Sequence, residues 1–250
     1  MNKPPLPVKA DLALLEPFAG LTLEQIFVPV TEAEFATAAA EIQAAGFVGF
    51  DTESKPTFKV GEVSTGPHLV QFALENKAFL FQVHHAVGLP FLQALLESEQ
   101  VVKVGFDLKS DGKHIHAKLG ATLGGVLDLM KLFRQRGYAK DMGVRTAVGI
   151  VLQRNFNKSK RISTSDWSRR ELNPPQLLYA ANDAYAALQV WRGLNLPPAD
   201  LAESNDQLIK KGDLRHPFSS LKHCSLNVRC RHRHGCDRVP ALQPSRHARQ

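Results

Sequence analysis

Apolar and polar positions divide the chain into short apolar runs separated by polar segments that contain glycine or proline. The run Phe47–Phe50 ends in Asp51-Thr52-Glu53, and its length and composition predict a strand over residues 47–53. Comparable runs predict further strands at residues 26–30, 69–74, 78–83, 101–106 and 126–129. The turn residues Glu75–Lys77 separate two of these runs, so we expect them to pair as a hairpin and to continue an antiparallel arrangement from the first strand.

Helical segments lie between these strands. Thr31 and Glu34 form a capping-box pattern before an alanine-rich segment, which predicts a helix to about Ala45. Asn173 is a good N-cap and Pro174 suits the first helical position, so a second clear helix is expected to reach about Arg192. Weaker patterns predict helices at residues 90–97, 107–120, 130–137 and 141–153, followed by a polar loop at 155–168. With 250 residues, the chain is long enough for one α/β domain with extensions.

Two carboxylates stand at the end of the strand at 47–53. In an extended strand residues i and i+2 point to the same side, so Asp51 and Glu53 face one way and Thr52 faces the other. Neighbouring carboxylates repel unless a positive charge lies between them. Taken alone, the pattern is more simply explained by a strand that runs into an acidic, solvated turn.

Two later helices carry further candidate residues. Asp111 lies one turn into the helix that we expect to start at Asp107, with Asp107 as its N-cap. Tyr179 and Asp183 are four residues apart, and therefore share one face of the last helix. Each of these side chains alone is also consistent with an ordinary surface carboxylate or a tyrosine at the edge of the core.

Together the acidic residues form a constellation drawn from three separate elements: Asp51, Glu53, Asp111 and Asp183, with Tyr179 beside the last of them. Four carboxylates can surround two divalent cations about 3.5–4 Å apart, an arrangement that activates a hydroxide and stabilises a leaving oxygen in phosphoryl chemistry. Oxygen ligands suit Mg²⁺ or Mn²⁺, whereas Zn²⁺ favours histidine and cysteine. The constellation therefore predicts a centre with two Mg²⁺ or Mn²⁺ ions.

The charge of the chain is concentrated near its end. Of the formal net charge of +7, residues 213–250 contribute +6 and residues 1–212 only +1. The charge of the main part therefore gives no argument for nucleic-acid binding. No apolar run approaches the roughly 18 residues of a membrane span, and no signal peptide is evident, so we expect a cytoplasmic protein without a membrane partner.

The basic segment also holds all three cysteines. Cys224, Cys230 and Cys236 are each separated by five residues, unlike the usual zinc-knuckle spacing, so a zinc site is not expected. Apolar residues are sparse in this segment, which predicts disorder from about residue 213. Its scattered arginines suit non-specific contacts with phosphates.

Three ordered motifs resemble those of the DEDD superfamily of 3′→5′ exonucleases. They are Phe50-Asp51-Thr52-Glu53, the segment from Lys103 to Asp111, and the segment from Leu178 to Tyr185. The match is closest to the group that contains RNase D, the Werner-type exonuclease domain and the proofreading domain of the DNA polymerase I family. Tyr179 stands four residues before Asp183, as in the tyrosine subtype; the histidine subtype would need histidine at position 178, where leucine stands.

This resemblance implies a ribonuclease H-like fold, with a mixed five- or six-stranded sheet flanked by helices. It also implies that Asp51, Glu53, Asp111 and Asp183 bind the metals and that Tyr179 orients the attacking water. Asp107 and Asp128 stay outside this set as capping or supporting groups. The expected organisation is an N-terminal extension (1–25), the exonuclease domain (26–195) and a C-terminal extension (196–250).

The implied activity is metal-dependent 3′→5′ hydrolysis of a nucleic acid with a free 3′ end, releasing nucleoside 5′-monophosphates. Two alternatives stay open: an RNA 3′-end trimming enzyme similar to RNase D, and an inactive nucleic-acid-binding module. Possible substrate contacts are Phe58, for stacking on the terminal base, and the basic residues Lys158, Lys160 and Arg161, for phosphates. A core position for Phe58 and a solvated loop for the basic residues are the competing interpretations.

Overall fold

A mixed sheet forms the centre of the protein in a computed structural model, which describes residues 9–59, 61–138 and 142–195. Within these residues the sheet has six strands in the order β1-β4-β3-β2-β5-β6. The strands are β1 (Ile26–Phe27), β2 (Phe47–Glu53), β3 (Leu69–Ala73), β4 (Ala78–Gln82), β5 (Val102–Gly105) and β6 (Val126–Asp128). β2, β3 and β4 are antiparallel, β5 and β6 continue parallel to β2, and β1 pairs in parallel with β4. The predicted mixed sheet is confirmed, with β1 as its sixth strand.

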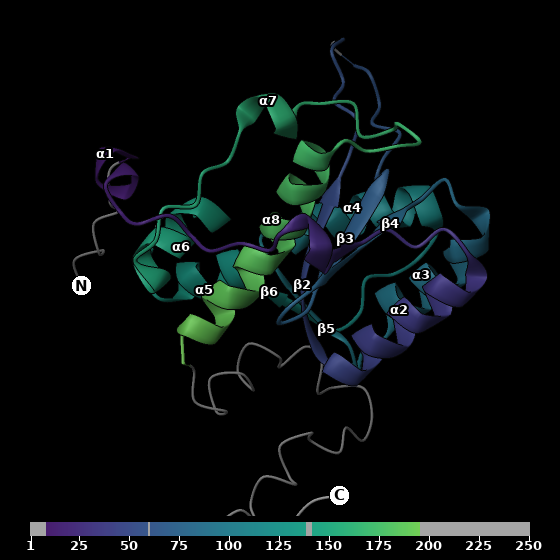
Figure 1. Cartoon of the computed structure of the whole chain (residues 1–250), viewed down its shortest axis with the longest axis horizontal. Coiled ribbons are helices and arrows are strands. Elements are labelled where there is room, and N and C mark those ends of the chain that lie inside the picture. Colours follow the sequence, from purple (N-terminus) through teal and green to yellow (C-terminus); the bar gives the residue numbers. More distant parts are fainter. Residues whose placement is uncertain (1–8, 60, 139–141, 196–250) are drawn as a thin grey trace, which may run out of the picture. The chain divides into compact units, whose positions relative to one another are not determined.

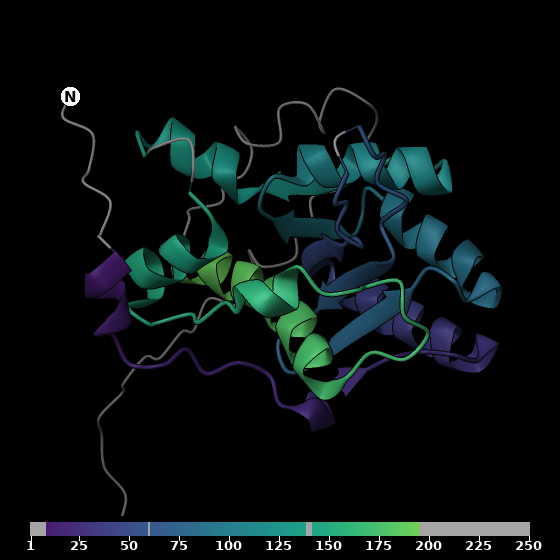
Figure 2. The same ribbon diagram turned by 90° about the horizontal axis from the view of Figure 1, so that it is seen from above.

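Helices cover both faces of this sheet (Figures 1 and 2). They are α1 (Lys9–Ala13), α2 (Glu32–Ala45), α3 (Leu89–Glu97), α4 (Leu108–Leu119), α5 (Leu129–Gln135), α6 (Val144–Leu152), α7 (Lys160–Ser163) and α8 (Pro174–Gly193), with short 3-10 turns at Leu23–Gln25 and Ala86–Gly88. Apolar side chains of α2, α3 and α4 pack in one core cluster with one face of β2, β3 and β4. Alanines of α8 pack against the opposite face, and α6 packs against α8.

The alternation of side chains along β2 assigns its residues to these two layers. Val48 and Phe50 are fully buried in the cluster with α2 and α3. Gly49 and Asp51, between and after them, point to the face that α8 covers. The same alternation places Gln71 of β3 beside Asp51, since these two residues are paired across the strands.

Gly49 allows α8 to lie unusually close to the sheet. A Cβ atom added at this position would stand 2.0 Å from the carbonyl oxygen of Ala184, so only glycine fits. The alanines of α8 have the same effect from the other side, since Ala180, Ala181 and Ala184 are completely buried without bulky side chains. The close packing brings the acidic residue next to Ala184 towards the end of β2.

Local sequence signals account for the ends of the two clearest helices. Thr31 Oγ1 accepts a hydrogen bond from Glu34 N, and the Glu34 carboxylate accepts one from Thr31 N, as the capping-box pattern predicts. At the start of α8 the Asn173 side chain accepts a hydrogen bond from Gln176 N at 3.0 Å. Both predicted helix starts are confirmed.

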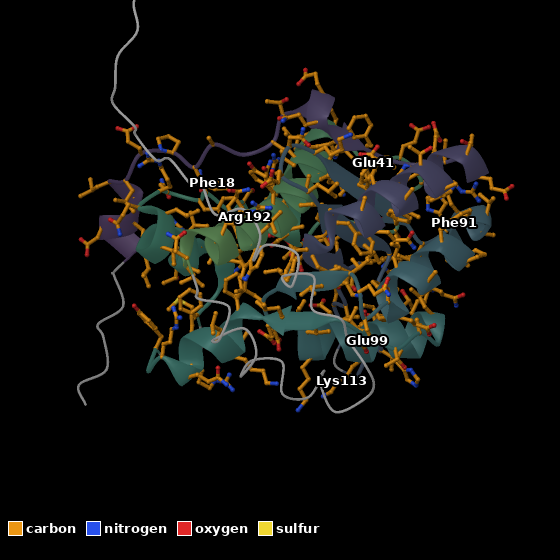
Figure 3. The ribbon with its side chains drawn as sticks, turned by 90° about the horizontal axis from the view of Figure 1, so that it is seen from below. Phe18, Glu41, Phe91, Glu99, Lys113 and Arg192 are labelled. Atoms are coloured by element: carbon orange, nitrogen blue, oxygen red, sulfur yellow. The ribbon has the colours of Figure 1, made fainter. Side chains whose placement is uncertain are left out.

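The segment before the sheet is more ordered than its weak pattern indicated. Leu12 and Leu21 are buried, and the Asn182 side chain of α8 binds both the N–H and the carbonyl group of Leu21. Figure 2 shows this segment running past α8, and the ring of Phe18, labelled in Figure 3, packs against Tyr185 of α8 with ring centroids 6.0 Å apart. Residues 9–25 therefore pack on the domain that the sequence placed at 26–195.

Two further elements differ from the sequence prediction. The expected strand at 26–30 is only two residues long, because Phe27 already reaches the edge of the sheet and is 45% exposed. The expected polar loop at 155–168 contains one turn of helix, α7. The predicted C-terminal extension, 196–250, lies outside the described residues. Among the described residues, no helix is long and apolar enough to cross a membrane.

The contact at Gly49 gives the first testable prediction. Gly49→Ala should destabilise the protein by about 1–3 kcal/mol, because the new methyl group overlaps the backbone of α8 and forces it outwards. Urea unfolding monitored by circular dichroism measures this loss.

A matched control is Gly112→Ala in the middle of α4. There the added Cβ would meet Leu123 at 3.7 Å, an ordinary contact, so the better helix propensity of alanine should raise stability by about 0.5–1 kcal/mol. Equal effects of the two substitutions would contradict the close approach of α8 to β2.

Candidate active site

Three carboxylates meet where β2 ends beneath α8. Asp51 and Glu53 come from β2, and Asp183 comes from α8, one residue before the Ala184 that touches Gly49. One oxygen atom from each of the three lies within 4.8 Å of the other two. The predicted grouping of these residues is therefore present, and it follows from the alternation of β2 and the close packing of α8.

Burial makes this group of negative charges electrostatically costly. Loss of solvent raises the pKa of Asp51 and, together with the charges of Asp51 and Asp183, raises the pKa of Glu53 to about 10. Burial also raises the pKa of Asp183 to about 7, although the nearby ammonium of Lys158 opposes this shift. Carboxylates that hold their protons so strongly are poised to exchange them for another positive charge. Because the donor atoms are all carboxylate oxygens, the group fits a hard divalent cation.

Lys158 enters this group from the connection between α6 and α7. Its Nζ lies 2.5 Å from Asp183 Oδ2 and 5.3 Å from the centre of the Tyr179 ring. Burial alone would lower the pKa of Lys158, but the charges of Asp183 and Asp51 raise it above its usual value, so the side chain is cationic. Of the three basic residues predicted to bind phosphate, Lys158 is thus the one that the structure brings to the carboxylates.

Tyr179 lies one turn before Asp183 and is half-buried. Its hydroxyl group interacts with the Asp183 carboxylate, and burial and this negative charge raise the pKa of the phenol above its usual range. The Tyr179 ring packs against Trp167, whose ring is fully buried and whose Nε1 donates a hydrogen bond to Ser163 O. The neutral hydroxyl is therefore held in place and can donate a hydrogen bond or accept one.

Asp111 approaches the end of β2 from the opposite face of the sheet. Thr52 Oγ1 donates a hydrogen bond of 2.5 Å to Asp111 Oδ1, so the residue that points away from Asp51 and Glu53 is the one that contacts Asp111. Burial and the charge of Asp51 raise the pKa of Asp111 to about 8, while the bond from Thr52 opposes the shift. The charge of Asp51 thus affects Asp111, the fourth predicted carboxylate, but Asp111 is not part of the close group of three.

The two acidic residues kept outside the ligand set behave differently from each other. Asp107 precedes α4 as predicted, but it has φ of 57° and its side chain caps no N–H group, so the prediction of a side-chain cap was wrong. The left-handed conformation of Asp107 differs from the extended one that an N-cap residue normally adopts. Asp128 instead accepts hydrogen bonds from Met130 N and Lys131 N, and so caps α5.

Comparison with known protein families agrees with this geometry. Residues 26–196 match the family described as 3'-5' exonuclease, which is more than half of the chain. The chain belongs to this 3'-5' exonuclease family. The matched segment coincides closely with the predicted domain and includes all the residues of the acidic site, and the predicted membership of the DEDD superfamily is confirmed.

Individual relatives support the same conclusion. A protein named 3'-5' exonuclease from Arabidopsis thaliana is 32% identical over 157 residues, which cover 61% of this chain and 54% of that protein. The bifunctional 3'-5' exonuclease/ATP-dependent helicase WRN of Mus musculus is 29% identical over 209 residues, covering 79% of this chain and 15% of the mouse protein. The chain therefore spans only about half of one relative and a small part of the other.

Solved structures of low sequence identity share the fold. RNase D from Trypanosoma brucei superposes with a TM-score of 0.64 at 22% identity, covering 73% of this chain and 70% of that one. The Nibbler EXO domain of Aedes aegypti gives a TM-score of 0.59 at 18% identity, covering 76% of this chain and 92% of that one. Both are ribonuclease H-like exonuclease domains, so the predicted fold is confirmed.

The remaining predicted substrate residues of this exonuclease domain lie around the acidic group rather than in it. Phe58 is 82% exposed on the connection from β2 to β3, which projects beyond the end of the sheet in Figure 1. A core position for Phe58 is therefore wrong. Lys160 and Arg161 are exposed on α7, near the start of α8 in the same view. The connection that carries Phe58 starts directly after Glu53, at the end of β2 that carries Asp51 and Glu53, and α7 packs on α8.

Sequence reasoning missed one polar residue of the site. Gln71 of β3 is fully buried beside Asp51, and neither its Nε2 nor its Oε1 atom has a hydrogen-bond partner among the described residues. A glutamine inside the apolar run Leu69–Ala73 was the available signal. Its free amide gives the acidic group a further polar neighbour that can bind water or a ligand.

The raised pKa values lead to a prediction about pH. Unfolded carboxyl groups ionise near pH 4, whereas Asp183 and Glu53 keep their protons to about pH 7 and about pH 10. The unfolded state therefore binds fewer protons over this window, so in chelator the free energy of unfolding should fall as the pH rises from about 5 to 9. Mg²⁺ should reduce this fall, because cation binding replaces the retained protons.

Thermal denaturation across this pH range, with EDTA or with Mg²⁺, measures both effects. Calorimetry in buffers of different ionisation enthalpy should show proton release on Mg²⁺ binding and an affinity that increases with pH. The variant Asp183→Asn should show a weaker pH dependence. An affinity that does not change between pH 6 and 9 would contradict the role of these protons.

Proposed function

We propose that this chain is a metal-dependent 3′→5′ exonuclease of the tyrosine subtype, which removes nucleoside 5′-monophosphates from the 3′ end of a nucleic acid. The observation that carries the proposal is the grouping of Asp51, Glu53 and Asp183 within 4.8 Å, with Tyr179 against Asp183. An inactive binding module would not need to retain this buried and mutually repulsive set.

The carboxylates would hold two Mg²⁺ or Mn²⁺ ions. When bound, these ions supply a hydroxide at neutral pH and stabilise the charge on the leaving oxygen. Asp51, Glu53 and Asp183 converge from one side, whereas Asp111 reaches the end of β2 from the other side through its contact with Thr52. Asp51, whose charge affects both Glu53 and Asp111, is the residue best placed to serve both ions.

Tyr179 would orient the attacking water. A phenol with a raised pKa is a poor base at neutral pH, so its neutral hydroxyl serves by hydrogen bonding. Packing of its ring against Trp167 fixes the direction of this hydrogen bond.

The substrate would approach the acidic group between the exposed segments at this end of the sheet. Phe58 is free to stack on the terminal base, and Lys160 and Arg161 are free to contact phosphates. The similarity in fold to RNase D favours RNA trimming as a second candidate function. DNA and RNA oligonucleotides of one sequence, each with a single 3′ or 5′ label, would separate these possibilities and would identify the released product.

Replacing a metal-binding carboxylate tests the proposal most directly. Asp51→Asn and Asp183→Asn should each reduce turnover by at least about 10²–10³-fold, as expected for loss of a major electrostatic stabiliser. EDTA should abolish activity and Mg²⁺ or Mn²⁺ should restore it. Glu41→Gln provides a control, since Glu41 lies on α2, away from the site, and pairs with Lys77, so turnover should not change.

Folding of each variant is confirmed by circular dichroism before assay. Full activity of the wild-type chain in excess chelator would refute metal dependence, and full activity of Asp51→Asn would refute the assignment of its ligand.

Tyr179→Phe separates water orientation from metal binding. Loss of the hydroxyl should lower the single-turnover rate by about 10–10³-fold, while Mg²⁺ affinity stays within a factor of about two, because the ring and the carboxylates remain. Tyr185→Phe on the same helix is the matched control, since its ring packs against Phe18, and it should leave the rate unchanged. Equal rates for wild type and Tyr179→Phe would leave Tyr179 as a packing residue.

A further inference from the structure

The ammonium group of Lys158 lies against the carboxylates that the proposed function assigns to a metal ion. Its Nζ is 2.5 Å from Asp183 Oδ2, and Asp183 belongs to the group of three whose oxygens lie within 4.8 Å of one another. The electrostatic effect of Lys158 also extends to Asp51 and Glu53. One lysine therefore neutralises part of the charge of all three residues.

A divalent cation would bind the same three carboxylates. Asp183 is almost fully buried, with 2% of its side chain exposed, so its carboxylate has little room to turn between two separate positive partners. An ammonium group and a divalent ion on the same carboxylate would repel each other at close range, and low solvent access strengthens this repulsion. Lys158 and the cation cannot both bind Asp183 Oδ2 closely.

The side chain of Lys158 can move its ammonium group away from Asp183. Its side chain is 30% exposed, and the residue belongs to the non-helical connection between α6 and α7. A lysine stem is flexible, so the ammonium can move without any shift of the backbone. The Tyr179 ring, whose centre lies 5.3 Å from Nζ in this position, is a second neighbour that the ammonium would leave or keep as it moves away from Asp183.

We propose that Lys158 is a resident counter-ion of the Asp51–Glu53–Asp183 group, which a divalent cation must displace before the site becomes active. The proposal rests on the proposed function for the metal ion, and adds that this chain carries its own competitor for the site. Lys158 stabilises the group in the absence of a divalent cation and weakens the binding of the first cation. Its displaced ammonium is then available to an incoming phosphate. The binding of Lys158 and of the cation to the group is thermodynamically linked. The factor by which the lysine weakens cation binding equals the factor by which the bound cation weakens the ion pair.

Lys158→Met removes the charge and keeps most of the stem, and Lys160→Met is the matched control two residues away, because Lys160 is exposed on α7. Both variants and the wild type are compared without substrate at pH 8. The affinity for Mg²⁺ and Mn²⁺ is measured by calorimetry, and the melting temperature is measured in EDTA and in saturating Mg²⁺.

Lys158→Met should bind the cation about tenfold more tightly than the wild type, within the usual range of coupling between two linked ligands. In EDTA its melting temperature should fall by about 3 °C, and in saturating Mg²⁺ this difference should disappear. Lys160→Met should match the wild type in all three measurements.

Two results would overturn the proposal while leaving the metal site intact. Equal cation affinity of Lys158→Met and wild type would show that the lysine does not compete. An equal loss of melting temperature in EDTA and in Mg²⁺ would make the ion pair a permanent structural contact. If the wild type binds no divalent cation at all, the proposed function fails together with this inference.

Discussion

Mutual repulsion of closely grouped carboxylates, one buried and two partly buried, is the constraint on which the rest of this structure depends. Asp51, Glu53 and Asp183 are held with oxygens within 4.8 Å of one another, and loss of solvent raises the pKa of each. Such a group opposes folding unless protons, an ammonium group or a metal ion neutralises it. The apolar layers on both sides of the sheet supply the stability that keeps the group together.

The close approach of α8 to β2 determines where the carboxylate of α8 lies. Gly49 leaves space for the carbonyl group of Ala184, and the neighbouring Asp183 is thereby placed over the end of the strand. Asn182, on the other side of Asp183, ties α8 to the backbone of Leu21. The segment of α8 that carries Asp183 is therefore fixed from both sides by contacts with residues that are far away in the sequence.

Local residue patterns predicted helix starts and shared faces, whereas contacts between distant segments could be predicted only where the motifs of a known family indicated them. The capping box at Thr31, the N-cap at Asn173 and the common face of Asp51 and Glu53 follow from local geometry, and the structure contains all of them. The ion pair of Lys158 with Asp183 joins a connection to a helix 25 residues later, so spacing gave no signal for it. The left-handed conformation of Asp107 was equally hidden, since aspartate is also a common N-cap.

The side chains at the end of β2 contact carboxylates on both faces of the sheet. Asp51 and Glu53 face Asp183 on the α8 side, while Thr52 between them turns to the other side and binds Asp111 of α4. The two groups come close here because β5 pairs with β2 only as far as Gly49, so this edge of β2 is open at Asp51–Glu53 while β3 still pairs with the other edge. Asp51 raises the pKa of both Glu53 and Asp111, and it is therefore the electrostatic link between the two sides. Neutralising Asp51 would therefore relieve the repulsion on both sides at once, because its charge acts on Glu53 and on Asp111.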